Sequence, residues 1–116
     1  MDSDRALAAL GSLAQEHRLA IFRLLVQAGD DGRAAGTIAE ALAVPSSSLS
    51  FHLAHLHRAG LIRQQRQGRS LIYSADYGAM NALIGYLMEN CCAGAGCVAP
   101  AAERTERPSR QKRKSA

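Results

Sequence analysis

The segment from Ser46 to Ser74 constrains the fold more than any other part of this chain. Its first half, SSSLSFHLAHLHRAGLI, places Leu49, Leu53 and Leu56 at i, i+4 and i+7, which predicts a short helix with one apolar stripe toward a core. Gly60 is expected to end this helix. The second half, LIRQQRQGRSLIYSA, predicts two strands joined by a tight turn that contains glycine. A helix followed directly by such a hairpin, or wing, is typical of domains that read DNA.

Positive charge is concentrated in the same segment. The two predicted strands meet at Gln67-Gly68, and Arg66 and Arg69 flank the tip of the hairpin. With Arg58 and Arg63, they place four arginines within twelve positions. The formal net charge of +4 comes entirely from the tail that begins at residue 98, because the first 97 residues carry eight basic and eight acidic side chains. Since clustered positive charge attracts phosphate, nucleic acid is the expected partner.

Three helices are predicted before this segment. The first spans Asp4 to Ala14 with Ser3 as its N-cap, and the second, EHRLAIFRLLVQAG, is apolar on most sides and ends at Gly29. After a polar turn, DDGRAA, the sequence GTIAEALAV predicts a short amphipathic helix, which Pro45 separates from the helix that starts near Ser46. Two helices joined by a tight turn match the helix-turn-helix geometry.

A last helix is predicted from Asp76, its cap, to about Asn90. Its apolar stripe, together with that of the first helix, exceeds what one small core covers, which predicts a homodimer joined through these two helices. The predicted fold is therefore mainly α with a small β-hairpin, a winged helix-turn-helix. We expect one domain over residues 1–97 and a disordered basic tail over 98–116.

Other classes of protein are disfavoured. No apolar run reaches eighteen residues and the N-terminus, MDSDRALAAL, is acidic, which predicts a soluble cytoplasmic protein without membrane contact. An enzyme is not expected, because no spacing of a nucleophile and a base is evident and the domain is too small to enclose a substrate. A pure protein-interaction module remains a third class, which the charged wing disfavours.

The sequences SSSLSFHLAHLHRAGLI and RQQRQGRSLIYSA resemble the ArsR/SmtB family of winged-helix repressors, over roughly residues 5–90. The resemblance implies a homodimer on an inverted-repeat operator of double-stranded DNA. The DNA-binding residues expected in the helix and the wing are Ser46, Ser47, Ser48, Ser50, Phe51, His52, His55, Arg66 and Arg69. Plainer roles compete with this one: serines 46–48 as helix caps, and the two arginines as charges that keep an edge strand soluble. His57 is expected to be solvated.

The cysteines form a second cluster. Cys91, Cys92 and Cys97 are the only three, and all lie in CCAGAGC after the last helix. Neighbouring helical residues point about 100° apart, so Cys91 and Cys92 converge only where the helix has ended. Three thiolates without a fourth ligand disfavour structural zinc and fit trivalent arsenic or antimony, whose fourth direction is a lone pair. No structural cofactor is expected.

This triad resembles the cysteine site of an arsenic-sensing subset of the family. The resemblance implies a repressor that arsenite or antimonite releases from its operator. The short helix GTIAEALAV lacks the cysteines of the family's better-known site, so we expect the signal to start at the dimer helix. The alternative is a redox- or persulfide-sensing repressor that uses a pair of cysteines.

Overall fold

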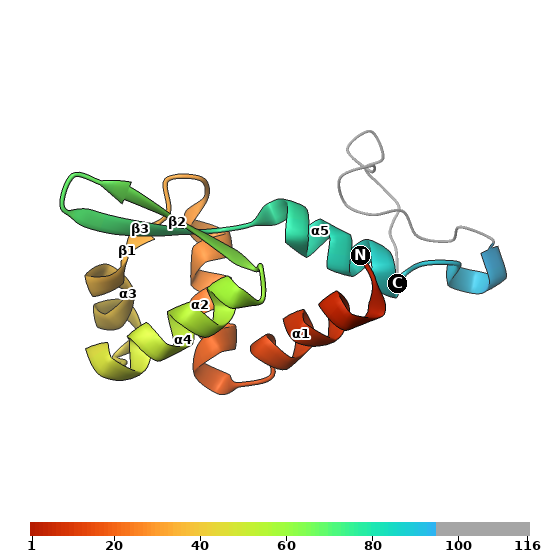
Figure 1. The fold of residues 1–116 in the computed structure, drawn as a ribbon, viewed down its shortest axis with the longest axis horizontal. Helices are drawn as coiled ribbons and strands as arrows, with labels where there is room; N and C mark the ends of the chain where they lie inside the picture. The colour runs from red at the N-terminus through yellow and green to blue at the C-terminus, as the bar shows by residue number, and fades with distance from the viewer. Residues whose placement is uncertain (95–116) are drawn as a thin grey trace.

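The structure, a computed structural model, describes residues 1–94 and confirms the predicted class, a mainly helical domain with a small antiparallel wing (Figure 1). Its elements are α1 (Ser3–Leu13), α2 (Glu16–Ala28), β1 (Arg33–Ala34), α3 (Ala35–Leu42), α4 (Ser46–Arg58), β2 (Ile62–Gln67), β3 (Ser70–Ala75), α5 (Tyr77–Leu87) and the short 3₁₀ helix η1 (Cys91–Gly94). Cys97 and the predicted tail lie outside the described residues. None of the helices within residues 1–94 is long and apolar enough to cross a membrane.

The core surrounds α2, as its apolar character predicted. Ile21 and Leu25 of α2 are fully buried and pack in one cluster with Ile38 of α3 and with the Leu49, Leu53 and Leu56 stripe of α4. Full burial of each such side chain contributes about 1.5–3 kcal/mol. The stripe therefore fixes which face of α4 is left for solvent or for a partner.

Capping of the helices differs from the prediction at two of three places. Asp76 caps α5 as predicted, since its Oδ1 accepts a hydrogen bond from the backbone N of Ala79 at 3.0 Å. The cap of α1 is Asp2, not Ser3, and its Oδ1 accepts from the backbone N of Arg5 at 2.8 Å. At α4 the N-cap position is occupied by Pro45, and no side chain caps the helix. Serines 46–48 are therefore not caps, because they already lie in the first turn, where they are exposed.

The end of α4 agrees with the prediction. Gly60 has a φ of +81°, a left-handed conformation that only glycine adopts without strain. The next residue, Leu61, donates its backbone N–H to the carbonyl of Leu56 at 3.1 Å. This closing bond turns the chain out of α4 and into β2.

The wing contains a third strand that the sequence did not predict. Strand order is β1-β3-β2, and Arg33 and Ala34 of β1 pair with Tyr73 and Ile72 of β3. The stretch DDGRAA is thus only partly a polar turn. Pairing of Gln67 with Ser70 leaves Gly68 and Arg69 as the two turn residues, one position later than predicted. The wing is anchored to the rest of the domain through β1.

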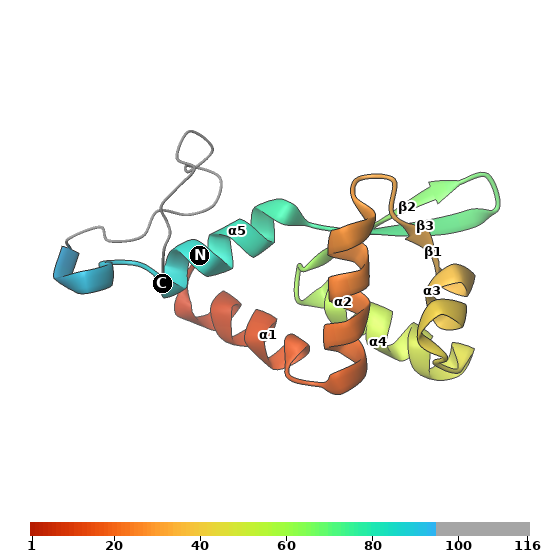
Figure 2. The ribbon, with the colours of Figure 1, turned by 180° about the vertical axis from the view of Figure 1, so that it is seen from behind.

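The domain has two ends, which Figures 1 and 2 show from opposite sides. Helices α1 and α5 lie together at one end, whereas α3 and the tip of the wing lie at the other. Several large apolar side chains on α1 and α5 are exposed, namely Leu7, Leu10, Ile84 and Leu87. Helix α5 ends at Leu87, before the predicted Asn90, whose φ of +58° does not continue a helix. The cysteines thus follow the helix rather than belonging to it.

Candidate nucleic-acid interface

The exposed face of α4 carries small side chains and one aromatic ring. Ser47, Ser50, Phe51 and Ala54 are all exposed, because successive residues turn by about 100° and these four lie away from the buried leucines. Phe51 is 59% exposed, unusual for a large apolar side chain. A single helix with such a face fits the width of a DNA major groove.

His52 does not lie on this exposed face, which corrects its predicted placement there. It is only 8% exposed, since it is one turn from Leu49 and next to Leu53 and so lies at the border of the buried stripe. Nη1 of Arg18 lies 3.4 Å from its Nδ1, the geometry of a guanidinium donating to a neutral imidazole. The ring of His17 lies 5.5 Å from that of His52, centroid to centroid.

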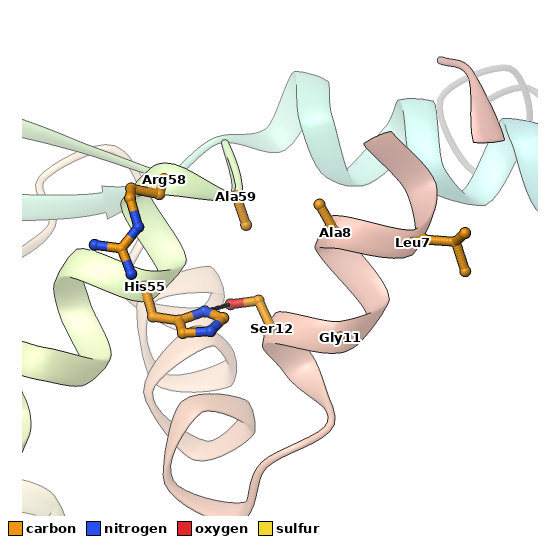
Figure 3. A pocket seen from close by; sticks show the side chains of 7 residues that line it. All are labelled: Leu7, Ala8, Gly11, Ser12, His55, Arg58 and Ala59. Carbon is orange, nitrogen blue, oxygen red and sulfur yellow. Dashed lines mark hydrogen bonds between the residues drawn. The ribbon is translucent and has the colours of Figure 1, made fainter. Parts of the chain in front are cut away.

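His55 also forms a hydrogen bond within the domain. Its Nδ1 lies 3.0 Å from Oγ of Ser12, a residue of α1 that is fully buried (Figure 3). Nε of Arg18 donates to the backbone carbonyl of Ser12 at 2.7 Å, so Arg18 contacts both His52 and the residue that bonds His55. Ser12, Arg18, His52 and His55 form a set of polar contacts that we call the polar joint. It ties α1 and α2 to the helix that is predicted to read DNA.

The sequence contained no signal for Ser12 or Arg18, which are the partners that position the two histidines. Both are separated from them by more than thirty residues of sequence. Figure 3 also shows the shallow groove between α1 and α4 that the Ser12–His55 bond crosses. Arg58 and Ala59 line it on the α4 side, and Leu7, Ala8 and Gly11 line it on the α1 side.

The wing presents its arginines beside α4. Arg66 lies on β2 opposite Leu71, and Arg69 lies in the turn. Both line a hollow whose other walls include Ser50 of α4 and the start of α3. The sequence from Ala41 to Ala75 contains four arginines and no acidic residue. Nothing in this stretch neutralises them, so the hollow has the charge and the hydroxyl groups to hold a phosphate backbone.

Cys91 and Cys92 lie where the helix has ended, as their predicted convergence requires. Cys92 has a φ of +57°, and the two Sγ atoms are 3.3 Å apart. Cys91 is half-buried and Cys92 is exposed. Among residues 1–94, no group of three or more histidine, cysteine or acidic side chains is arranged to hold a metal ion.

Known proteins similar to this chain are transcriptional regulators. Residues 13–65 match the model of a family described as a helix-turn-helix domain. The HTH-type transcriptional regulator YgaV of Escherichia coli is 32% identical over 90 residues, which cover 78% of this chain and 89% of YgaV. The transcriptional activator HlyU of Vibrio cholerae is 30% identical over 78% of this chain and 82% of HlyU.

Solved structures agree. A structure of Vibrio cholerae HlyU has a TM-score of 0.62 at 29% identity and covers 79% of this chain and 99% of its own, and a second one is described as reduced HlyU. The homodimeric winged helix-turn-helix domain of Mb0332 from Mycobacterium bovis, described as a possible ArsR-family regulator, has a TM-score of 0.61 at 25% identity, over 83% of this chain and 89% of its own. This chain belongs to the ArsR family of winged helix-turn-helix transcriptional regulators.

As an ArsR-family regulator, the chain binds DNA and is not an enzyme, as the sequence predicted. Helices α3 and α4 form its helix-turn-helix, and α4 is the recognition helix. The polar joint then connects the recognition helix to the end of the domain formed by α1 and α5.

The polar joint makes the stability of this ArsR-family regulator sensitive to acid. Burial lowers the pKa of His52 below its ordinary value of 6.5, and the positive charges of Arg18, His17 and His55 lower it further. The folded state therefore binds a proton at His52 less readily than the unfolded state does. We expect the free energy of unfolding to fall as the pH drops through about 6.5 toward the lower folded-state pKa, and this contribution to be constant above that window.

Chemical denaturation at a series of pH values measures this effect. His52→Gln, which keeps a hydrogen-bond acceptor for Arg18, should flatten the acid side of the stability profile. His57→Gln removes an exposed imidazole from the same helix and serves as the matched control, with the profile of the unmodified protein. Equal acid slopes for the two variants would contradict this role of His52.

Proposed function

We propose that this regulator acts in the cytoplasm as a homodimer on an inverted-repeat operator, and that oxidation or persulfidation of cysteine thiols beside α5 changes its affinity for DNA. The observation that carries the proposal is the 3.3 Å separation of the Cys91 and Cys92 sulfurs, just beyond the last turn of α5. Once both are reduced, two sulfur atoms this close are within reach of a single thiol-modifying reagent. The reaction would then occur directly after α5, at the end of the domain where we expect the dimer to form.

Exposed apolar side chains support the dimer. Leu7 of α1 is 64% exposed and Leu87 of α5 is 59% exposed, and the two helices lie together in both views of the ribbon (Figures 1 and 2). A patch of this kind, with Leu10 and Ile84, is costly in water unless a second copy covers it. The Mb0332 domain, which has the same fold, is described as homodimeric. A two-fold dimer would present two recognition helices to two half-sites.

The relatives support a response to thiol chemistry over one to arsenic. Neither YgaV nor HlyU is named for arsenic, and one HlyU structure is distinguished as the reduced form. A two-electron oxidant would join two of the three thiols as a disulfide and release two protons. A persulfide or polysulfide would instead transfer its outer sulfur to a cysteine thiolate, with its S–S bond broken and a thiolate or shorter polysulfide released. Either change alters the chain directly after α5 and thereby the packing of the two subunits.

Arsenite or antimonite sensing is the second candidate, favoured by the presence of three cysteines within seven positions. A simple disulfide needs only two thiols, whereas trivalent arsenic binds three. In this case the operator would be released when Cys91, Cys92 and Cys97 together hold the ion. The two candidates share one DNA-binding surface and differ in the reagent that acts at the cysteines.

One titration distinguishes these candidates. Operator DNA is first selected from a random library by the full-length reduced protein, and binding is measured by fluorescence anisotropy. Diamide, inorganic polysulfide and arsenite are then added separately. We expect polysulfide or diamide to change the affinity by about 5- to 150-fold, the usual range of allosteric coupling. Mass spectrometry should show the loss of two hydrogens or the gain of sulfur, and dithiothreitol should reverse the effect.

Cysteine variants distinguish thiol sensing from arsenic sensing. Cys91→Ser, Cys92→Ser and Cys97→Ser test which thiols are required, and a promoter reporter gives the sign of regulation. An arsenite response with one arsenic per chain, lost in Cys97→Ser, would replace the proposal with the second candidate. An affinity that none of the three reagents changes would contradict both.

A further inference from the structure

We propose that Phe51 is a specificity-determining residue that recognises the C5-methyl group of thymine in the operator. This inference rests on the DNA-binding function proposed above and names the base that the recognition helix selects.

The proposed dimer surface does not account for the exposure of the Phe51 ring. The remaining exposed large apolar side chains of the described residues lie on α1, α2 and α5 or at Met1, and most belong to the surface assigned to the dimer. Phe51 is the one on α4, and it lies on the face opposite the buried leucines. A ring that is 59% exposed on a recognition helix gains contacts when that helix enters a groove.

The other side chains of this face cannot supply the common base contacts. Guanine is usually bound by arginine or lysine and adenine by asparagine or glutamine, each through two hydrogen bonds. None of these types occurs in α4 before its last residue, Arg58. Ser47 and Ser50 bond to either phosphate or base, and Ala54 adds only a methyl group. The thymine methyl is the apolar group of the major groove, and a phenyl ring is its natural contact.

The ring is also held in place before DNA arrives. Phe51 contacts the imidazoles of His52 and His55 edge to face, with centroid distances of 5.6 and 6.2 Å. Those imidazoles are bonded to Arg18 and Ser12 in the polar joint. The two histidines thus support the ring from behind instead of reading bases themselves. A side chain held in this way loses little conformational entropy on binding, which favours a specific contact.

Replacement of thymine by deoxyuridine tests the proposal, because uracil differs from thymine only by the missing methyl. Each thymine of the selected operator is replaced in turn, in both half-sites, and the affinity of the full-length protein is measured. We expect one position at which the change weakens binding by about three- to fivefold per half-site, the value of one buried methyl. In the Phe51→Ala variant, the same replacement of thymine by deoxyuridine should weaken binding by less than about twofold.

A second variant and a control complete the test. Phe51→Gln should shift the base selected at that position from thymine to adenine, which glutamine binds through two hydrogen bonds. Leu19→Ala, which removes an exposed apolar side chain from α2, should keep the full sensitivity to deoxyuridine. Specific binding that is insensitive to deoxyuridine at every position, or equally sensitive in Phe51→Ala, would overturn the role of Phe51 alone. If no DNA sequence is selected at all, the proposed function itself fails.

Discussion

Replacing both Arg66 and Arg69 with alanine is expected to weaken operator binding by about two to three orders of magnitude at 0.15 M salt. The two side chains line the hollow between the wing and α4, in a stretch without acidic residues. A dimer would lose four contacts to phosphate, and each contact accounts for about 0.9 of the slope of log affinity against log salt concentration. That slope should therefore become shallower by about 3 to 4.

Anisotropy titrations from low to high salt measure both quantities. Arg5→Ala combined with Arg23→Ala removes the same charge from exposed positions on α1 and α2, and it controls for a general effect of net charge. The order of preference among operator sequences should stay the same in the wing variant, since phosphate contacts position the protein without specifying bases. A slope equal to that of the control would mean that the arginines serve only to keep the edge of the wing soluble.

Gly32→Ala is expected to lower the free energy of unfolding by about 3–5 kcal/mol, a large share of the stability of a domain of this size. Gly32 has a φ of +66°, and a Cβ built there would lie 2.4 Å from the backbone oxygen of Tyr73 on β3. Left-handed backbone costs about 1–2 kcal/mol for alanine. The clash adds to this cost, because a backbone oxygen fixed in a sheet cannot move aside.

Gly60→Ala provides the matched control for that experiment. Gly60 also has a positive φ, but nothing lies within 4 Å of a Cβ at that position. Gly60→Ala should therefore lower the free energy of unfolding only by the cost of the left-handed backbone, about 1–2 kcal/mol. Thermal unfolding should show a decrease in melting temperature of about 15 °C or more for Gly32→Ala and much less for Gly60→Ala. Equal decreases would mean that β1 and β3 separate easily at this point.

The elements that the sequence predicted well are those whose pattern is local. The leucine stripe of α4, the cap at Asp76 and the stop at Gly60 are each visible within one or two helical turns of sequence. Strand β1 has only two residues, too few for any alternation of apolar and polar side chains to be visible. Its existence depends on pairing with β3, about forty residues further along the chain.

The sequence predicted only part of the candidate site, again because sequence patterns report local structure. Phe51 lies on the exposed face where helical periodicity placed it, whereas Arg69 lies in the turn of the wing instead of beside it. His52 was misplaced because it borders the leucine stripe, and periodicity does not decide whether a border residue turns inward. Arg18 and Ser12 decide that, through contacts between separate helices. Sensing at the cysteines stays a prediction, because Cys97 lies outside the described residues.

The pairing of β1 with β3 bears on how this regulator can acquire new target genes. Ala34 ends β1 and α3 begins at the next residue, so the wing and the helix-turn-helix are joined without an intervening loop. This direct connection restrains the wing relative to the helix-turn-helix, and we expect the two elements to keep their relative orientation. New binding sites would then arise in evolution through exchanges of exposed side chains such as Phe51, while the angle between helix and wing is inherited unchanged.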